Sequence, residues 1–458
     1  MAEALAVERS QTQAETRTVT AALAERVAAM RLVDLPPAAL TVAKQCLLDW
    51  IGVALAGRDE PLVRILLDEL APDDAPGGCS ILGHGRRARI DDAVLINGAM
   101  GHALDFDDVI MSMGHPTVPV APVVLALAEQ RGASGGEALV AFICGVEAEC
   151  RVARLMGPSH YAKGWHSTAT CGTFGAAVAA ARLLGVEGEA LTHAFGIAGT
   201  QAAGVKSVFG TMSKPLHPGR AAQNGLLAAR LAARGYTSDT DILGSDQGFA
   251  ATQSTIANAE AGLAERAAPW VVDALFKYHA ACYLTHDAIE AANRLRIEER
   301  LTPAAIDAVS VKVPAGHLGV CNIQAPSTGL ECKFSLRMTT AMALAGEDTF
   351  QESLFSDETA ARGDLVALRD RVTVDPTMVG RGSVVTARLK DGRVVSRSGD
   401  VSQPIRDLAA QQEKLEHKFR HLASGALGPE RARDVITLCR ELEAQSNVID
   451  LFALCSCD

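Results

Sequence analysis

The chain has 458 residues, a formal net charge of −11, 48% hydrophobic residues and 21% charged residues. This composition excludes a disordered chain, and the acidic excess argues against a nucleic-acid-binding protein, which needs a basic face. At about 100–200 residues per domain, the length predicts two or three domains.

Targeting and cysteine patterns indicate a cytoplasmic protein. No apolar run reaches the roughly 18 residues of a membrane span, and the polar, mixed-charge start of the chain lacks the apolar core of a secretory signal. The eleven cysteines are scattered, and Cys455 and Cys457 form the only short pair. Without paired CxxC motifs, a structural zinc site is not expected. We predict reduced thiols and no membrane association.

The first half of the chain has the pattern of successive helices. Residues 37–56 begin with a proline in the first turn and stop at Gly57. Residues 136–156 carry apolar side chains at three- and four-residue steps, which makes one buried stripe. Residues 172–184 and 221–234 are rich in alanine and almost entirely apolar, so we expect buried, closely packed helices there.

The pattern changes near residue 268 to strands mixed with helices. Period-two alternation predicts strands at 306–313 and 371–375. Residues 383–397 predict a hairpin whose tight turn is Asp391-Gly392. Further helices are predicted at 285–294, 333–345, 404–422 and 429–445.

These elements predict a mainly α protein with two domains. Residues 1–268 and 405–458 would form a large all-helical domain, and residues 269–404 a smaller α+β lid domain inserted into it. No GxGxxG motif follows a predicted strand, so a nucleotide-binding fold is not expected.

The segment 101–120 concentrates acidic residues and a histidine. Asp105, Asp107 and Asp108 fall within four positions, and His115 follows on a proline-bounded loop. Clustered carboxylates suit hard cations, whereas a carboxylate beside a histidine can orient it or exchange protons with it. Solvated acids at a helix end are the third interpretation.

Two further segments could bind an anion. In 161–175, His166 precedes three hydroxyl residues and a helix, which suits an anion at a helix N-terminus but equally a capping segment. In 210–220, Lys214, His217 and Arg220 lie in a predicted loop with glycines and prolines. They suit carboxylate recognition or a solvated turn.

The segment 276–287 carries Lys277, His279, Cys282 and His286 at the predicted domain junction. The spacing resembles zinc ligands, but the set is incomplete, and domain junctions commonly bind small ligands.

Together these segments supply cations and bases without a nucleophile elbow, a phosphate loop or a redox motif. Lysine and histidine without a cofactor suit removal of a proton next to a carboxylate, because preorganised positive charge stabilises the developing dianion.

Four segments, GHALDFDD…GHP, GWHSTATCGTFGAA, SKPLHPGRAAQNG and KYHAACYLTHDAIEA, carry a family resemblance over nearly the whole chain. In this order and spacing they resemble the 2-methylcitrate dehydratase (MmgE/PrpD) family, which also contains cis-aconitate decarboxylase and iminodisuccinate epimerase. The resemblance implies a helical domain with an α+β lid, a homodimer, and neither an organic cofactor nor a metal.

The resemblance also implies a catalytic set between the two domains: Asp105, His115, His166, Lys214 and Lys277. His115 or His166 would move the proton, Lys214 and Lys277 would hold substrate carboxylates, and Asp105 would orient a histidine or lysine. We further predict that His217, Arg220 and Cys282 contact the substrate. Cys282 could instead be a packed, inert thiol.

Three positions depart from the decarboxylase pattern. This chain has Val109 where the decarboxylase has a threonine, and Cys282 where it has a histidine. In the nearest alignment, Val320 replaces a tyrosine of the decarboxylase. The groups that decide the fate of the carbanion therefore differ. We expect an enzyme acting on a small anionic di- or tricarboxylic acid, with a dehydratase first. An epimerase of an iminodisuccinate-like acid, a cis-aconitate-type decarboxylase and a non-catalytic carboxylate-binding protein follow in that order.

Overall fold

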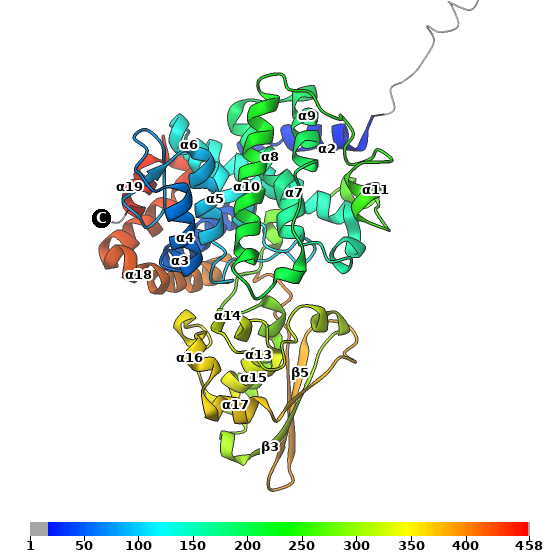
Figure 1. Ribbon diagram of the computed structural model, residues 1–458, viewed down its shortest axis with the longest axis vertical. Coiled ribbons are helices and arrows are strands. Elements are labelled where there is room, and N and C mark those ends of the chain that lie inside the picture. Colours follow the sequence, from blue (N-terminus) through cyan, green and yellow to red (C-terminus); the bar gives the residue numbers. More distant parts are fainter. Residues whose placement is uncertain (1–16, 457–458) are drawn as a thin grey trace, which may run out of the picture.

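The computed structural model describes residues 17–456, which form a broad helical body above a narrower α+β part (Figure 1). The predictions for the start of the chain and for Cys457 lie outside the described residues. The helices of the body are α2 (Val19–Ala28), α3 (Pro37–Gly57), α4 (Pro61–Leu70), α5 (Ile90–Met100), α6 (Thr117–Arg131), α7 (Gly135–Ala162), α8 (Ser167–Leu184), α9 (Gly188–Gly199), α10 (Ser213–Ala232), α11 (Phe249–Gln253), α12 (Ala259–Leu263), α18 (Leu408–Arg440) and α19 (Ile449–Cys455). A short antiparallel pair, β1 (Cys79–Ser80) and β2 (Arg87–Ala88), lies among them.

Close packing of α8 against α6, α7 and α10 depends on small side chains. A Cβ added at Gly172 would lie 2.8 Å from Pro119 Cγ, and one at Gly175 would lie 2.6 Å from Glu149 Oε2. The abundance of glycine and alanine therefore allows the close helix packing that the composition predicted.

Helix boundaries follow local signals. The prediction at 37–56 is confirmed by α3, which begins at Pro37. Ser134 caps α7 with a complete capping box, and the helical backbone breaks at Gly157 (φ 65°), where the predicted helix ends; a second helical stretch continues α7 to Ala162. The two helices predicted at 404–422 and 429–445 correspond to the two helical stretches of α18, which are separated by the non-helical Gly428 (φ 71°).

The start of α10 corrects the sequence analysis. We predicted a loop at 210–220 and a helix from 221, but the helix begins at Ser213. Pro215 lies in its first turn, where a proline loses no helical hydrogen bond. Pro218 lies inside the helix, where it removes one such bond without ending the helix.

The α+β part contains a four-stranded sheet in the order β4-β3-β5-β6. Its elements are α13 (Tyr283–Glu298), β3 (Ile306–Lys312), α14 (Gly329–Cys332), α15 (Leu336–Ala345), α16 (Asp357–Ala360), α17 (Gly363–Arg369), β4 (Val372–Asp375), β5 (Ser383–Leu389) and β6 (Val394–Gly399). Strand β3 pairs parallel with β4 and antiparallel with β5. The predicted hairpin is confirmed by β5 and β6, and Gly392 has the positive φ (91°) that its turn needs. Helix α13 packs on β5 and β6 (Figure 1).

Two hydrophobic cores account for the two parts. The first joins the helices before residue 277 to those after 407, and α18 packs along α3. The second belongs to the α+β part but also includes Val53, Leu104, Phe106 and Leu422 of the body. A mainly α fold is thus confirmed, and the exact domain boundaries stay a prediction.

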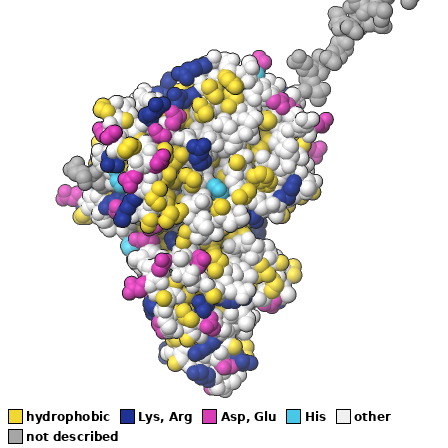
Figure 2. Space-filling view, in the orientation of Figure 1, with side chains coloured by type: hydrophobic (Ala, Val, Ile, Leu, Met, Phe, Trp, Pro, Cys, Tyr) yellow, Lys and Arg dark blue, Asp and Glu magenta, His cyan; other side chains and the backbone are white. Residues whose placement is uncertain are grey.

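The described residues give three further observations, on membrane association, disulfides and surface charge. Helix α3 has the length and composition of a membrane-spanning helix, but most of it is buried inside the protein, as in a core helix. None of the cysteines within residues 17–456 is in a disulfide. Acidic and basic side chains are interspersed over the face in Figure 2, without a field of one sign.

Candidate active site

A cavity of about 480 Å³ lies where the two cores meet. Apolar wall residues come from the first core, such as Ile110 and Met113, and from the second, such as Phe334. The polar wall includes Asp105, His115, His166, Thr168 and Lys214. Four of the five residues predicted to be catalytic therefore line one cavity.

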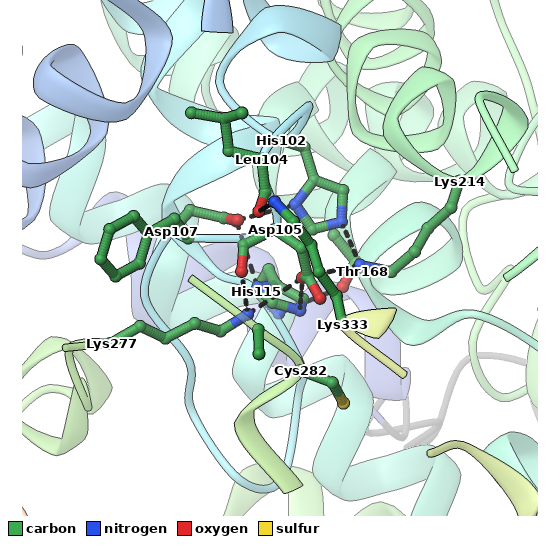
Figure 3. A network of polar contacts seen from close by, with 12 residues as sticks. His102, Leu104, Asp105, Asp107, His115, Thr168, Lys214, Lys277, Cys282 and Lys333 are labelled. Carbon is green, nitrogen blue, oxygen red and sulfur yellow. Dashed lines mark hydrogen bonds and ion pairs between the residues drawn. The ribbon is translucent and has the colours of Figure 1, made fainter. Parts of the chain in front are cut away.

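The segment after α5 supplies the acidic side of the site. Asp105 has a left-handed φ of 50°, which costs energy for a residue other than glycine. Three consecutive carbonyls each accept a hydrogen bond from a buried lysine: Leu104 from Lys333 (2.5 Å), Asp105 from Lys277 (2.7 Å) and Phe106 from Lys418 (2.8 Å). Because these lysines come from distant parts of the chain, tertiary structure holds this strained segment in place; Figure 3 shows Lys277 and Lys333 beside it.

The Asp105 carboxylate pairs with two lysines. Its Oδ1 accepts hydrogen bonds from Lys214 Nζ (2.8 Å) and Lys277 Nζ (2.9 Å), and His115 Nε2 lies 3.6 Å away. Burial raises the pKa of Asp105, but the two lysines outweigh burial and hold that pKa well below its usual value. The other oxygen, Oδ2, is buried without a hydrogen-bond partner among the described residues.

Asp107 lies between two imidazoles. Its Oδ1 is 2.8 Å from His102 Nδ1, and its Oδ2 is 3.1 Å from His115 Nδ1. On the far side of His102, Nε2 lies 3.0 Å from Lys214 Nζ (Figure 3). Burial raises the pKa of Asp107, but the adjacent histidines outweigh it and lower the pKa well below its usual value. The sequence analysis did not select His102, although it stands in the same GHALDFDD motif as the acids.

Burial favours the neutral form of both predicted base histidines. Burial lowers the pKa of His115 and places that of His166 well below its usual value, with Lys214 lowering the latter further. His115 lies on the expected loop, where its backbone N–H donates to Thr168 Oγ1 (3.1 Å). His166 directly precedes α8, and its ring packs against Phe209. A neutral imidazole can accept a proton, so either histidine could serve as a base.

The three cations predicted at 210–220 diverge because they lie on a helix. Lys214 faces the cavity. The Nδ1 of His217 lies 3.0 Å from Nδ1 of His166, and His217 is not part of the cavity wall. Arg220 is exposed, hydrogen-bonds to Gln223 and does not reach the cavity. The predicted substrate contacts of His217 and Arg220 are therefore not supported by this geometry.

The candidate residues of the segment 276–287 also lie in different places and do not form one site. Lys277 is fully buried behind Asp105 and is not part of the cavity wall. It therefore pairs with the Asp105 carboxylate and is not placed to bind a substrate carboxylate as predicted. Cys282 lines the cavity at the start of α13, and a hydrogen bond with Cys321 lowers its pKa. His279 is bound to Thr349 and Glu290 instead of sharing a site with Cys282. The zinc interpretation of this segment therefore finds no support among the described residues.

The three departures from the decarboxylase pattern all face the cavity. Val109 and Val320 line it together with Cys282, and Val109 packs with Tyr283, the residue after Cys282. This wall is therefore less polar than the resemblance alone implies. At the cavity rim, Arg154 is exposed, and no ion pair joins it to another described residue.

The cluster His102, Asp105, Asp107 and His115 offers four possible ligand atoms within 4.8 Å of one another. However, Oδ1 of Asp105 already accepts from two ammonium groups, and His102 Nδ1 faces Asp107. A cation placed there would face the charges of Lys214 and Lys277 directly. The donor set therefore fits a network of hydrogen bonds better than a metal ion, and we assign no metal site.

Comparison with known proteins matches both parts of the chain. The MmgE/PrpD N-terminal domain matches residues 21–261 and the MmgE/PrpD C-terminal domain matches residues 279–444. The chain belongs to the MmgE/PrpD family. It is similar to cis-aconitate decarboxylase of Aspergillus terreus, with 27% identity over 96% of both chains. It is also similar to the cis-aconitate decarboxylase-like protein oryM of Aspergillus oryzae (28%, covering 96% of this chain and 97% of the relative) and to human cis-aconitate decarboxylase (28%, covering 77% and 76%). These relatives include enzymes, and the family resemblance seen in the sequence is confirmed.

Proposed function

We propose that this protein is a lyase that removes a proton next to a carboxylate of a small di- or tricarboxylic acid, with loss of a β-hydroxyl group as the first choice. The observation that carries the proposal is that the imidazoles of His115 and His166 face the same cavity as the Lys214 ammonium, and burial lowers the pKa of both rings. A base and a positive charge are the two requirements for forming a carbanion beside a carboxylate.

Each residue has a distinct part in this reaction. His115 or His166 accepts the proton. Lys214 binds a substrate carboxylate and offsets the charge that develops on it. Thr168, at the start of α8, adds a hydroxyl and the positive end of a helix. Lys277 acts indirectly, because it holds Asp105 in place from outside the cavity.

The unpartnered oxygen of Asp105 supports a hydroxy acid as substrate. It is buried, it belongs to a cavity residue, and it stays ionised, so it can only accept a hydrogen bond. A substrate hydroxyl is a suitable donor, and burying this oxygen without one would be costly. The oxygen would hold that hydroxyl next to the reacting carbon.

Decarboxylation is a further candidate function. It is favoured by the relatives named as a cis-aconitate decarboxylase and a decarboxylase-like protein, which match over nearly the whole chain. It is disfavoured by the apolar character of Val109 and Val320 in the cavity wall. An epimerase, which returns the proton to the other face, needs the same base and cation and ranks between the two. A protein that only binds carboxylates would keep the cation without turnover.

We also propose that residues 269–404 act as a lid and that the protein is a homodimer. The position of the cavity between the two cores supports a lid, because relative movement of the parts would open and close it. The dimer rests on the family resemblance and is tested by light scattering.

Proton NMR in D₂O with 2-methylcitrate, citrate, cis-aconitate, malate and iminodisuccinate tests the reaction. We expect an alkene product from a hydroxy acid. Carbon dioxide loss from cis-aconitate would replace the dehydratase with a decarboxylase, and C–H exchange without a new product would favour an epimerase.

His166→Ala should abolish turnover, whereas His421→Ala, on the body side near Glu352 and outside the cavity, should not. If all five acids stay unchanged while one of them still raises the melting temperature, the lyase proposal is wrong and a binding protein is favoured.

A further inference from the structure

The cluster behind the cavity contains a carboxylate that the proposed reaction does not use. Asp107 is fully buried and absent from the cavity wall, so it cannot touch a substrate. Both of its oxygens nevertheless face ring nitrogens, at 2.8 Å and 3.1 Å. A residue in this place can act only through the two histidines.

The contacts of His102 determine which nitrogen carries its proton. An ionised carboxylate only accepts hydrogen bonds, so Nδ1, next to Asp107, must carry the hydrogen. Burial lowers the pKa of His102 to about 3, so the ring is neutral and its Nε2 has a free lone pair. That lone pair faces Lys214 Nζ at 3.0 Å, and Lys214 donates to it.

The Nδ1 of His115 also faces Asp107. Its Nδ1 and the Oδ2 of Asp107 lie 3.1 Å apart, both are buried, and neither has a hydrogen-bond partner among the described residues. A hydrogen on Nδ1, with a small rotation of the ring toward Oδ2, would satisfy both atoms. The lone pair is then on Nε2, on the side of Asp105, which lines the cavity with His115.

We infer that Asp107 is the positioning residue of this site: it fixes His102 and His115 as Nδ1–H tautomers, which makes His115 Nε2 the base and His102 Nε2 an acceptor that holds Lys214. One carboxylate thus sets both the base and the cation of the proposed reaction. The inference depends on the proposed function for its kinetic consequences but not for the tautomers themselves.

Charge on His115 is also balanced by this arrangement. The titratable and charged groups that face it are Asp105, Asp107, His102, His166, Lys214 and Lys277. Two carboxylates flank the imidazolium that forms when Nε2 takes a proton, while the two lysines and burial favour the neutral ring at rest.

The test compares Asp107→Asn with Asp108→Asn, a matched loss of one buried acid. Asp108 faces Thr117 and not an imidazole. We expect Asp107→Asn to lower kcat about 10²–10⁴-fold with KM changed little, because the amide supports the wrong tautomer, as when the aspartate of a catalytic triad is replaced. Asp108→Asn should keep kcat.

Two further measurements separate positioning from a structural role. Removing the carboxylate that raises the pKa of His115 should shift the acid limb of the kcat–pH profile to lower pH in Asp107→Asn. Histidine-selective ¹⁵N NMR of the intact protein should show His102 and His115 as Nδ1–H tautomers, and Asp107→Asn should change them. His102→Gln and His115→Gln assign the signals.

The NMR measurement tests the positioning role of Asp107 even if no substrate turns over. Unchanged tautomers in Asp107→Asn overturn it, and so does a loss of kcat without movement of the acid limb. If no tested acid reacts but the wild-type tautomers are as described and change in Asp107→Asn, the proposed lyase function fails and the positioning role of Asp107 stands.

Discussion

Three carboxyl groups within four positions of one segment have different ionisation states because their neighbours differ. Asp105 faces two lysines and Asp107 two histidines, and the pKa of each lies well below its usual value. Asp108 points away from these groups toward Thr117, and burial, followed by the charges of Asp49 and Asp107, raises its pKa to about 7. Sequence proximity therefore does not determine charge here.

Asp108→Asn should gain stability relative to wild type as the pH rises. The folded-state pKa of Asp108, about 7, is above its unfolded value, so wild type binds a proton more tightly when folded. That advantage is complete below the unfolded pKa near 3.8 and is lost as pH rises through about 7. Asparagine does not ionise, and it can keep both contacts to Thr117.

The measurement is denaturant unfolding of both proteins at pH 5 and pH 8. The free energy of unfolding of Asp108→Asn minus that of wild type should increase by about 1–3 kcal/mol between these pH values. Other titrating groups are common to both proteins and cancel in this difference. An equal difference at both pH values would show that Asp108 does not titrate in this range.

Residue types and motif spacing predicted many residues of the site, but not which of them line the cavity and which lie behind it. Asp105, His115, His166 and Lys214 converge as the sequence analysis expected. It could not predict that Lys277 lies behind Asp105, because a lysine that holds a carboxylate and one that binds a substrate look the same in sequence. His102 was missed for the related reason that its role comes from contacts with Asp107 and Lys214, which only the fold brings together.

At the scale of elements, the packing of α5 against α10 determines where Lys214 lies relative to the site segment. The two helices approach at glycines: a Cβ added at Gly98 would lie 2.7 Å from Gly219 Cα, and one added at Gly219 would lie 2.4 Å from Leu95 O. Helix α10 carries Lys214 in its first turn, and the site segment begins where α5 ends. The prolines of α10 resemble loop signals in the sequence, which hid this start of the helix, although the first turn of a helix accepts proline.

Gly219→Ala should therefore reduce both stability and activity. The new methyl group would contact backbone atoms of Leu95 and Ala99, which cannot rotate away, so α5 and α10 must separate. Overpacking of this kind costs about 1–3 kcal/mol, and displacement of Lys214 should lower kcat. Thermal unfolding and turnover of the same preparation measure both effects.

Gly425→Ala on α18 is the control for this substitution. It is also a helical glycine, but an added Cβ meets no atom within 4 Å. Its stability should be equal to wild type or higher by up to about 1 kcal/mol, because alanine is the better helix former. Unchanged stability of Gly219→Ala would show that the helices can separate without cost.

At the scale of the whole molecule, the active-site cavity belongs to both parts of the chain. The segment 101–115 leaves the helical body, and its residues Leu104 and Phe106 pack into the core of the α+β part. Lys333, near the start of α15, reaches back to the carbonyl of Leu104. Periodicity predicted the two kinds of structure along the chain, but the contacts that join them are long-range and leave no local pattern.

Because both parts contribute wall residues, a bound acid should protect both from amide exchange. We expect tricarballylate, a tricarboxylate without a hydroxyl group, to slow hydrogen–deuterium exchange at 109–115 in the body and at 282–284 and 320–336 in the α+β part. Exchange measured by mass spectrometry with and without the acid reports each segment separately. Lys214→Met should lose the protection in both parts of the chain, because it lacks the ammonium group that would bind the carboxylate of the acid. If the acid binds, as calorimetry would show, and protects only one part, the other does not close over the ligand. The lid proposal would then be wrong, although the chemistry at His115 and Lys214 could remain.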